Sequence, residues 1–274
     1  MPKPKDAFSA RLASPVTAKR AILAALTATQ RALSTAQLRL CGALFDVEGP
    51  AVRVALGRLV DKGDVVSQGE GVYKIGPKGE AIAQAIRRWR DLPRLDRSWN
   101  GEWIAIHTAH LGRSRRPQLR RRERALSLFG FASVTDGLWT RPDNLRIEPA
   151  ALASRLFELG LEPEAILVVG ARFIAEPAQG LGCLWDKETI EAGYVAAESA
   201  MASCLEGFER ASLKERARGT ATIGTAVIGM LSFDPLLPRE LLDADLRGAV
   251  HRRMLEFDRI GKRALVAYWQ DHGC

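Results

Sequence analysis

Apolar residues recur at helical spacing from residue 51 to residue 60, and arginines occupy the opposite side of the same stretch. The apolar positions are Ala51, Val52, Ala55, Leu56, Leu59 and Val60. Arg53 and Arg58 fall on the other face. Gly49 is a possible cap, Pro50 suits the first helical turn, and Gly63 ends the pattern. The segment is therefore predicted to be a helix that buries one face and presents two arginines outward.

Two short apolar runs follow this helix directly. Val65 and Val66 form the first run, and residues 72–75 form the second. The segment between them contains Gly69 and Gly71, which adopt positive φ without steric cost. This pattern predicts a β-hairpin.

Two more helices are predicted upstream. Residues 16–29 carry an apolar face, and Ser34 or Thr35 can cap a helix over the leucines that follow. Three helices and then a hairpin is the element order of a winged helix-turn-helix, so the first part of the chain is predicted to bind DNA.

Roles for individual side chains follow from how such domains dock. The last helix enters the major groove, and the helix before it crosses the DNA backbone. The predicted DNA-binding residues are therefore Thr35, Gln37, Arg39, Arg53 and Arg58, with Gln68 and Lys74 from the hairpin. The alternative for each outward arginine is a solvated side chain without a partner.

The distribution of charge along the chain is more informative than the total net charge of +8. The net charge is +8 over residues 1–100, +5 over residues 101–146 and −5 over residues 147–274. A basic front and a mildly acidic rear suit a chain whose first part meets phosphate.

The middle of the chain alternates strand-like and helix-like patterns. Strands are predicted at 103–107, 131–134, 138–140 and 165–169, and helices at 117–129 and 149–159. Asp136 and Gly137 mark a hairpin turn. The order βαββαβ is that of a ferredoxin-like domain, a fold that serves many functions.

From residue 186 onward the chain is predicted to be mainly helical, with a proline-containing interruption at 233–242. The predicted fold class is therefore α+β multidomain. It has an N-terminal winged helix-turn-helix with a linker at 90–98 (residues 1–98), a central ferredoxin-like domain (99–175) and a helical C-terminal domain (176–274).

An arginine tract lies in the middle block. Leu119, Ala125, Leu126 and Phe129 make a core stripe, which leaves seven arginines for solvent: Arg113, Arg115, Arg116, Arg120, Arg121, Arg122 and Arg124. These arginines form either a solvated helix face or a second phosphate-binding surface.

Enzyme chemistry has weaker signals. His107 and His110 stand at the end of a strand without a nearby carboxylate, and the four cysteines are scattered. We expect no catalytic residues, metal or cofactor. The alternative is a metal-dependent nuclease or nucleic-acid processing factor that uses the middle domain. The N-terminus is polar and no run reaches the length of a membrane span, so we expect a cytoplasmic protein without a membrane partner.

Four segments together resemble the PaaX family, the bacterial repressors of phenylacetic-acid catabolism. They are Ala51 to Leu59 (AVRVALGRL), Arg97 to Trp103 (RSWNGEW), Gly130-Phe131 with Gly137 to Pro142 (GLWTRP), and Asp234 to Leu242 (DPLLPRELL). The resemblance covers nearly the whole chain.

The resemblance implies a homodimeric repressor that binds a double-stranded DNA operator and is released by an acyl-coenzyme A thioester. Candidate effector contacts are Arg120, Arg124, Trp185 and Tyr194; Phe208, Tyr268 and Trp269 are further aromatic residues of the C-terminal part. The chain departs from the family pattern at Asp243, Leu246 and Arg247, where the family has Pro, Trp and Pro, so the effector is expected to differ.

Overall fold

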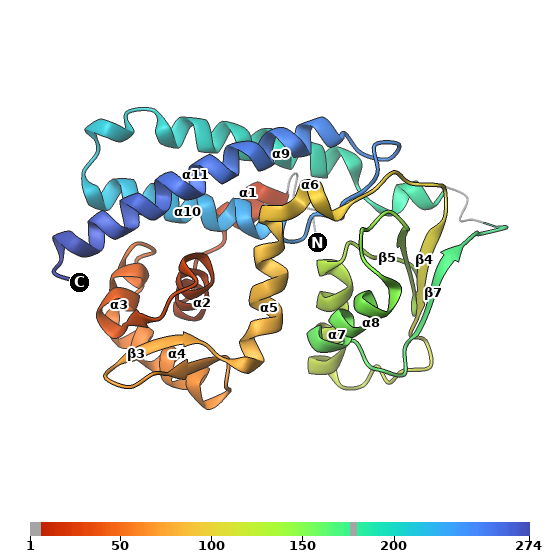
Figure 1. Cartoon of the computed structure of the whole chain (residues 1–274), viewed down its shortest axis with the longest axis horizontal. Coiled ribbons are helices and arrows are strands. Elements are labelled where there is room, and N and C mark those ends of the chain that lie inside the picture. Colours follow the sequence, from red (N-terminus) through yellow and green to blue (C-terminus); the bar gives the residue numbers. More distant parts are fainter. Residues whose placement is uncertain (1–6, 176–179) are drawn as a thin grey trace. The chain divides into compact units, whose positions relative to one another are not determined.

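The protein has a mixed α+β structure with two small antiparallel sheets and a helical C-terminal part (Figure 1). The structure is a computed structural model and describes residues 7–175 and 180–274. Its contacts divide the chain into two compact units. The first unit comprises Met1–Arg90, Ala192–Met230 and Ala249–Cys274, and the second comprises Asp91–Glu191 and Leu231–Gly248.

This division differs from the predicted boundaries at 98/99 and 175/176. The predicted C-terminal helical domain is shared between the two units, because its residues pack with elements that lie far away in the sequence. The local amino-acid composition does not reveal such long-range packing.

The first unit begins with a short helix and then the three helices of the basic N-terminal part. These are α1 (Ala7–Ala13), α2 (Ala18–Thr29), α3 (Thr35–Ala43) and α4 (Gly49–Asp61). Ser34 caps α3 through a capping box with Gln37, as the sequence allowed. Glu48, and not Gly49, is the N-cap of α4, and Pro50 lies in its first turn as predicted.

The hairpin follows α4 as predicted. It consists of β2 (Val65–Ser67) and β3 (Val72–Ile75), which pair antiparallel. Gly69 and Gly71 at its tip have φ values of 94° and 73°. A two-residue strand, β1 (Leu33–Ser34), adds to the other edge of β3 and was not predicted.

The core of this part reaches beyond the three helices. Leu38, Leu44, Val52, Leu56 and Leu59 pack with residues of the C-terminal helices, namely Ala217, Tyr268 and Trp269. Tyr268 and Trp269, two of the aromatic residues singled out in the C-terminal part, are therefore core residues.

The predicted linker at residues 90–98 contains the change from the first unit to the second, at Arg90/Asp91, but its first part is helical and not a loop. After α5 (Pro77–Arg87), the chain continues through η1 (Arg88–Asp91) and α6 (Leu92–Leu95). Trp89 and Leu92 are buried, Arg90 pairs with Asp258 at 3.0 Å, and Asp96 pairs with Arg247 at 2.8 Å. Proline and charge suggested a loop, but two large apolar residues and two ion pairs anchor the segment.

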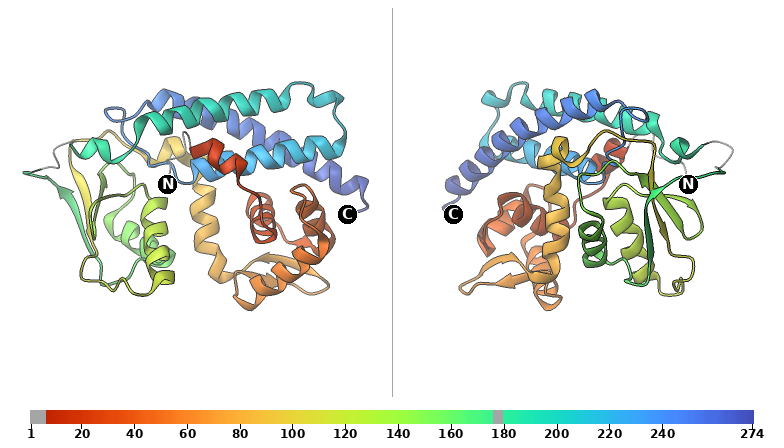
Figure 2. Two further views of the ribbon diagram at one scale, coloured as in Figure 1. Left: turned by 180° about the vertical axis from the view of Figure 1, so that it is seen from behind. Right: turned by 45° about the vertical axis from the view of Figure 1, so that its right-hand side comes forward.

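The second unit contains the predicted βαββαβ order of elements. These are β4 (Trp103–His107), α7 (Arg116–Leu128), β5 (Ala132–Thr135), β6 (Leu138–Pro142), α8 (Pro149–Leu159) and β7 (Ile166–Ala171). The sheet order is β5-β6-β4-β7 and all pairings are antiparallel. Helices α7 and α8 lie on the same face of this sheet (Figures 1 and 2).

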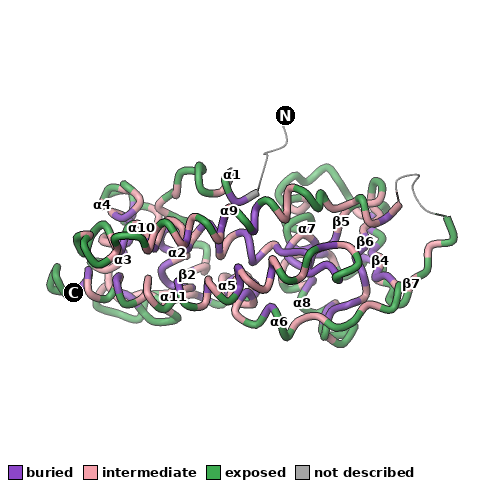
Figure 3. Tube along the Cα trace, turned by 90° about the horizontal axis from the view of Figure 1, so that it is seen from above, coloured by how far each residue is buried: buried purple, intermediate pink, exposed green. Residues whose placement is uncertain are grey.

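The edge strand β7 leaves apolar side chains in solvent. Ile166, Val168 and Val169 are each 45–53% exposed. Figure 3 shows this strand largely in the colour of exposed residues.

The segment that departs from the family pattern has structural roles in the second unit. The Asp243 carboxylate accepts hydrogen bonds from the backbone N–H groups of Asp245 and Leu246, at the start of the last helix. Arg247 is buried and donates to Asp96 and to the carbonyl of Leu237.

Three long helices complete the chain after η2 (Leu181–Leu184): α9 (Lys187–Leu205), α10 (Leu213–Leu231) and α11 (Ala244–Asp271), with η3 (Phe208–Arg210) between the first two. The parts of these helices that belong to the first unit run side by side (Figures 1 and 2). Tyr194, Met201, Val227 and Phe257 are buried between them.

Candidate nucleic-acid interface

Helix α4 presents a basic, solvent-exposed face. Val52, Leu56 and Leu59 are 3% exposed or less and fix the helix to the core. Arg53 and Arg58 are exposed on the other side, as predicted. Ala51 was expected in the core stripe but is exposed, because it lies at the margin of the buried face. The helix therefore carries two arginines on a firmly packed support.

Two of the three residues predicted near phosphate have local structural roles. The Thr35 hydroxyl and its backbone N–H both donate to the carbonyl of Gly71, at 3.0 and 2.8 Å. The Gln37 amide oxygen accepts from the N–H of Ser34 at 2.9 Å. Thr35 thus ties the hairpin tip to α3, and Gln37 caps the helix.

Arg39 is exposed and lies against the start of α4. A Cβ placed on Gly49 would be 2.9 Å from the Arg39 Nε atom, so only glycine fits beneath this guanidinium without movement. The positive side chain therefore stands beside the N-terminal end of α4, where free backbone N–H groups already favour anions.

The hairpin adds two polar side chains. Gln68 lies at its exposed tip and Lys74 is exposed on β3. Five exposed cations thus belong to α3, α4, the residue after α4 and β3: Arg39, Arg53, Arg58, Lys62 and Lys74. Among the described residues none of the five has a carboxylate partner. An open groove of about 550 Å³, lined by Ala51, Val54 and Arg58 among others, runs along the same helix.

The arginine tract on α7 is only partly available to solvent. Arg122 is buried, which corrects the prediction. Its Nε and terminal nitrogen donate to the two carboxylate oxygens of Glu162 at 2.9 and 2.5 Å, and the terminal nitrogen also reaches the carbonyl of Gly112. Arg113 pairs with Asp136 at 2.9 Å. Arg115, Arg116, Arg120, Arg121 and Arg124 are exposed.

The ion pairs shift acid pKa values in a consistent direction. Burial raises the pKa of the Glu162 carboxyl, but hydrogen bonds from Arg122 outweigh it, and the pKa is lowered overall. The hydrogen bond from Arg113 lowers the pKa of Asp136. Both carboxylates are therefore ionised partners of arginine at neutral pH.

The four predicted effector contacts are divided between the two units. Arg120 and Arg124 are exposed on α7, whereas Tyr194 is 1% exposed inside the other unit. Trp185 stacks on Trp103 with ring centroids 6.3 Å apart, and its indole N–H donates to the carbonyl of Gly130. Phe208 lies under the guanidinium of Arg216. The aromatic residues therefore have packing roles.

His107 and His110 contact each other at the end of β4. Their Nδ1 atoms are 3.3 Å apart, and His110 Nε2 lies 2.9 Å from the carbonyl of Glu164. Within residues 7–175 and 180–274, no group of three or more His, Cys, Asp or Glu side chains is placed to hold a metal ion.

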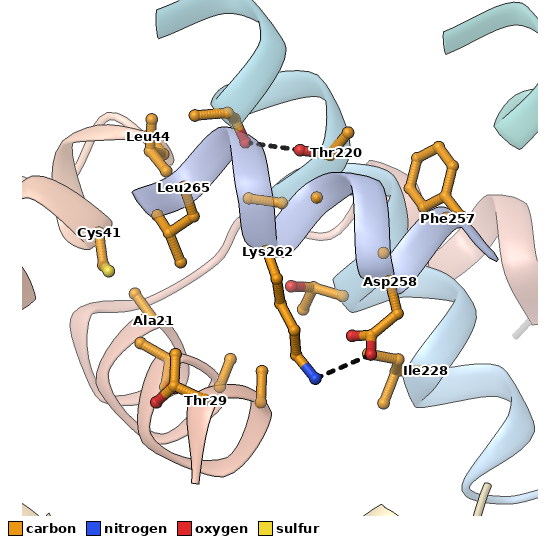
Figure 4. Close-up of a pocket in the computed structure, with 18 of the residues that line it drawn as sticks. Ala21, Thr29, Cys41, Leu44, Thr220, Ile228, Phe257, Asp258, Lys262 and Leu265 are labelled. Carbon is orange, nitrogen blue, oxygen red and sulfur yellow. Dashed lines mark hydrogen bonds and ion pairs between the residues drawn. The ribbon is translucent and has the colours of Figure 1, made fainter. Parts of the chain in front are cut away.

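A pocket that sequence reasoning missed lies between α2, α3, α10 and α11 of the first unit (Figure 4). Its lining is mostly alanine, glycine and other apolar residues, with Asp258 and Lys262 as charged members. The sequence signal was present in two stretches of small residues, AILAALTAT and TATIGTA, but these are equally common in closely packed helices.

Comparisons with known proteins show a likeness at the level of solved structures. No family model matches the sequence, and no curated protein matches it. Among solved structures, the uncharacterized protein Rv0674 from Mycobacterium tuberculosis aligns with a TM-score of 0.58 and 26% identity. The alignment covers 93% of this chain and 99% of the other, so the likeness extends over both units.

No helix in the described part of the chain combines the length and the apolar character needed to cross a membrane.

Proposed function

We propose that this protein is a DNA-binding transcriptional regulator, most simply a homodimeric repressor of the PaaX type. Helices α2, α3 and α4 with the β2–β3 hairpin would form its winged helix-turn-helix, and α4 would be the recognition helix. The observation that carries the proposal is the position of Arg53 and Arg58. They are exposed and unpaired among the described residues, on a helix that three buried side chains hold in place and that a hairpin with Lys74 follows at once.

The architecture of the second unit is compatible with this proposal. We propose that it is ferredoxin-like, because two helices lie on one face of an antiparallel sheet of order β5-β6-β4-β7. In such a regulator this unit would serve assembly. The exposed apolar side chains of β7, an edge strand, are suited to cover by a second copy of the chain.

An arginine that reads a base or phosphate makes a measurable contribution to affinity. A good base contact contributes about 1–3 kcal/mol, which corresponds to roughly 5- to 150-fold in affinity. We therefore expect Arg53→Ala and Arg58→Ala each to weaken binding to the cognate operator within that range, with an unchanged circular dichroism spectrum.

Arg252→Ala is the matched control for these variants. Arg252 is exposed on α11 and lies outside the proposed reading face. Its substitution should leave operator affinity within twofold of the wild type. Equal affinities for Arg53→Ala, Arg58→Ala and Arg252→Ala would show that α4 is not the recognition helix.

The alternative function, a metal-dependent nuclease, has one observation in its favour. The Nδ1 atoms of His107 and His110 are close enough to bind a single metal ion. Cleavage of DNA or RNA that requires a divalent cation and is lost in His107→Ala would support this alternative. Stable protein–DNA complexes without cleavage would support the regulator.

A further inference from the structure

We propose that the pocket between α2, α3, α10 and α11 is a regulatory site for a small apolar molecule that carries one anionic group, and that its occupation weakens DNA binding. The coupling to DNA rests on the proposed function, whereas ligand binding itself does not. Figure 4 shows the Lys262 side chain extending from α11 between the helices that line the pocket, with its ammonium group paired to Asp258.

Small side chains create this space. Ala24 and Ala28 of α2 line the pocket together with Ala221 and Gly224 of α10. A Cβ placed on Gly224 would meet only ordinary van der Waals contacts, 3.7 Å or more away. The facing helices therefore leave a gap that their own side chains do not fill, with a cavity volume of about 100 Å³.

The pocket wall offers almost no free hydrogen-bonding groups to a polar ligand. The hydroxyl of Thr29 donates to the carbonyl of Ala25 at 2.8 Å, and that of Thr220 donates to the carbonyl of Arg216 at 2.7 Å. Burial raises the pKa of the Cys41 thiol to about 12, so this side chain stays neutral. The apolar wall thus selects for apolar ligand surface.

One side of the pocket carries an excess of positive charge. Asp258 accepts from Arg90 at 3.0 Å and pairs with Lys262 at 2.9 Å. Two cations therefore share one carboxylate, and the cluster has a net charge of +1. A carboxylate on a ligand would neutralise this excess through the Lys262 ammonium, which lines the pocket.

Size limits the ligand further. Engineered cavities of about 150 Å³ hold a benzene molecule, and this pocket is of the same order but open on one side. One ring or a short alkyl chain with a carboxylate fits, whereas a nucleotide does not. The proposed ligand is therefore a free monocarboxylic acid. Binding of a coenzyme A thioester in its place is one of the outcomes that the test distinguishes.

The pocket is mechanically linked to α4. Cys41 and Leu44 line the pocket and also belong to the core that holds Val52 and Leu56 of α4. Gly42 of α3 lies so close to α4 that a Cβ there would be 2.6 Å from the Val52 Cγ2 atom. A shift of α3 is therefore passed on to α4.

A second link joins α10 to the turn between α3 and α4. Arg218 forms a two-pronged ion pair with Asp46, with distances of 2.7 and 2.5 Å. A ligand that separates α10 from α2 and α3 would act on both links. It would favour a different placement of the recognition helix, and by reciprocity DNA would weaken ligand binding by the same factor.

The first experiment is calorimetric titration of the full chain with benzoate and hexanoate, and with benzyl alcohol and hexan-1-ol as neutral counterparts. We expect at least one acid to bind with a dissociation constant below about 1 mM and at least tenfold tighter than its alcohol. Lys262→Met should remove the preference for the acid, whereas Lys214→Met, at an exposed lysine of α10, should retain it.

Ala24→Leu fills the pocket with a residue that helices accept readily. It should abolish acid binding, and Ala192→Leu, at an exposed position of α9, should not. Operator binding is measured in parallel, with and without the acid and with the benzoyl-coenzyme A thioester. The acid should lower the affinity of the wild type at least threefold and leave that of Ala24→Leu unchanged.

The outcomes separate the two proposals. If neither acid binds, or if the alcohols bind equally well, the pocket proposal is wrong whatever happens with DNA. If only the thioester binds and acts on DNA, the free-acid assignment is overturned. If acids bind as expected but no operator is bound, the ligand site stands and the regulator proposal fails.

Discussion

Replacing Arg122 with methionine should destabilise the second unit strongly, although the residue lies in a tract that looks solvent-exposed from the sequence. The Arg122 side chain is 3% exposed and that of Glu162 is 18% exposed. Three hydrogen bonds from the guanidinium would be lost, two of them to the carboxylate. Methionine retains much of the apolar packing of the arginine side chain. The loss of stability in this variant therefore reports mainly on the ion pair.

Removing one partner of a buried ion pair costs about 3–5 kcal/mol, because the other charge stays behind without compensation. Glu162 retains some contact with water, so we expect a loss around the lower end of this range, about 2–4 kcal/mol. Arg116→Met is the matched control, since Arg116 is exposed on the same helix. It should change the free energy of unfolding by less than about 0.5 kcal/mol.

Urea unfolding of the full chain, followed by tryptophan fluorescence, is a suitable assay because four of the six tryptophans, Trp99, Trp103, Trp139 and Trp185, belong to the second unit. The double variant Arg122→Met/Glu162→Gln should regain a large part of the lost stability. Similar unfolding curves for Arg122→Met and Arg116→Met would refute the assignment of a buried pair.

The same pair predicts a pH dependence. The pKa of Glu162 is lowered from its usual 4.5 in the folded protein, so its contribution to stability is present above that value and is lost as the pH falls through the folded pKa. The difference in stability between the wild type and Arg122→Met should therefore be full at pH 7 and shrink below about pH 4.5. A difference that is the same at pH 7 and pH 3 would contradict the ion-pair explanation.

Two further predictions test packing and phosphate contact. Gly130 has a φ of 72°, and a Cβ there would lie 2.5 Å from the carbonyl oxygen of Pro235, whereas Gly207 has a φ of 71° and open space around it. Gly130→Ala should therefore destabilise by at least about 2 kcal/mol more than Gly207→Ala, which costs about 1–2 kcal/mol for conformation alone; equal losses in urea unfolding would contradict the close approach. Lys74→Gln should reduce the slope of log affinity against log salt by about 0.9, the value for one phosphate contact, and Lys214→Gln should leave it unchanged; an unchanged slope for both would place Lys74 away from the DNA backbone.

Local patterns predicted the elements of the structure well. Helix α4 and the β2–β3 hairpin follow from apolar periodicity and two glycines, and the spans of β4 and α8 agree with the predicted residues. These features depend on neighbours within a few residues, which the sequence displays directly.

Features that depend on distant partners were not predictable in the same way. Arg122 has the same charge as its exposed neighbours, and only Glu162, forty residues away, makes it a buried residue. The hydrogen bond from the Thr35 hydroxyl to the carbonyl of Gly71 joins residues 36 positions apart, which no local pattern displays. The pocket arises where alanines of α2 meet those of α10, a pairing that no local pattern reveals.

The proposal that α4 reads DNA sequence is tested most directly by a mobility-shift titration with DNA from immediately upstream of the protein's own gene, against a duplex of the same composition in shuffled order, at one salt concentration. We expect the upstream DNA to bind at least about 10³-fold more tightly, the lower end of the range for specific recognition, and Arg53→Ala to reduce this ratio. Equal affinity for both duplexes, unchanged in Arg53→Ala, would contradict sequence-specific binding through α4.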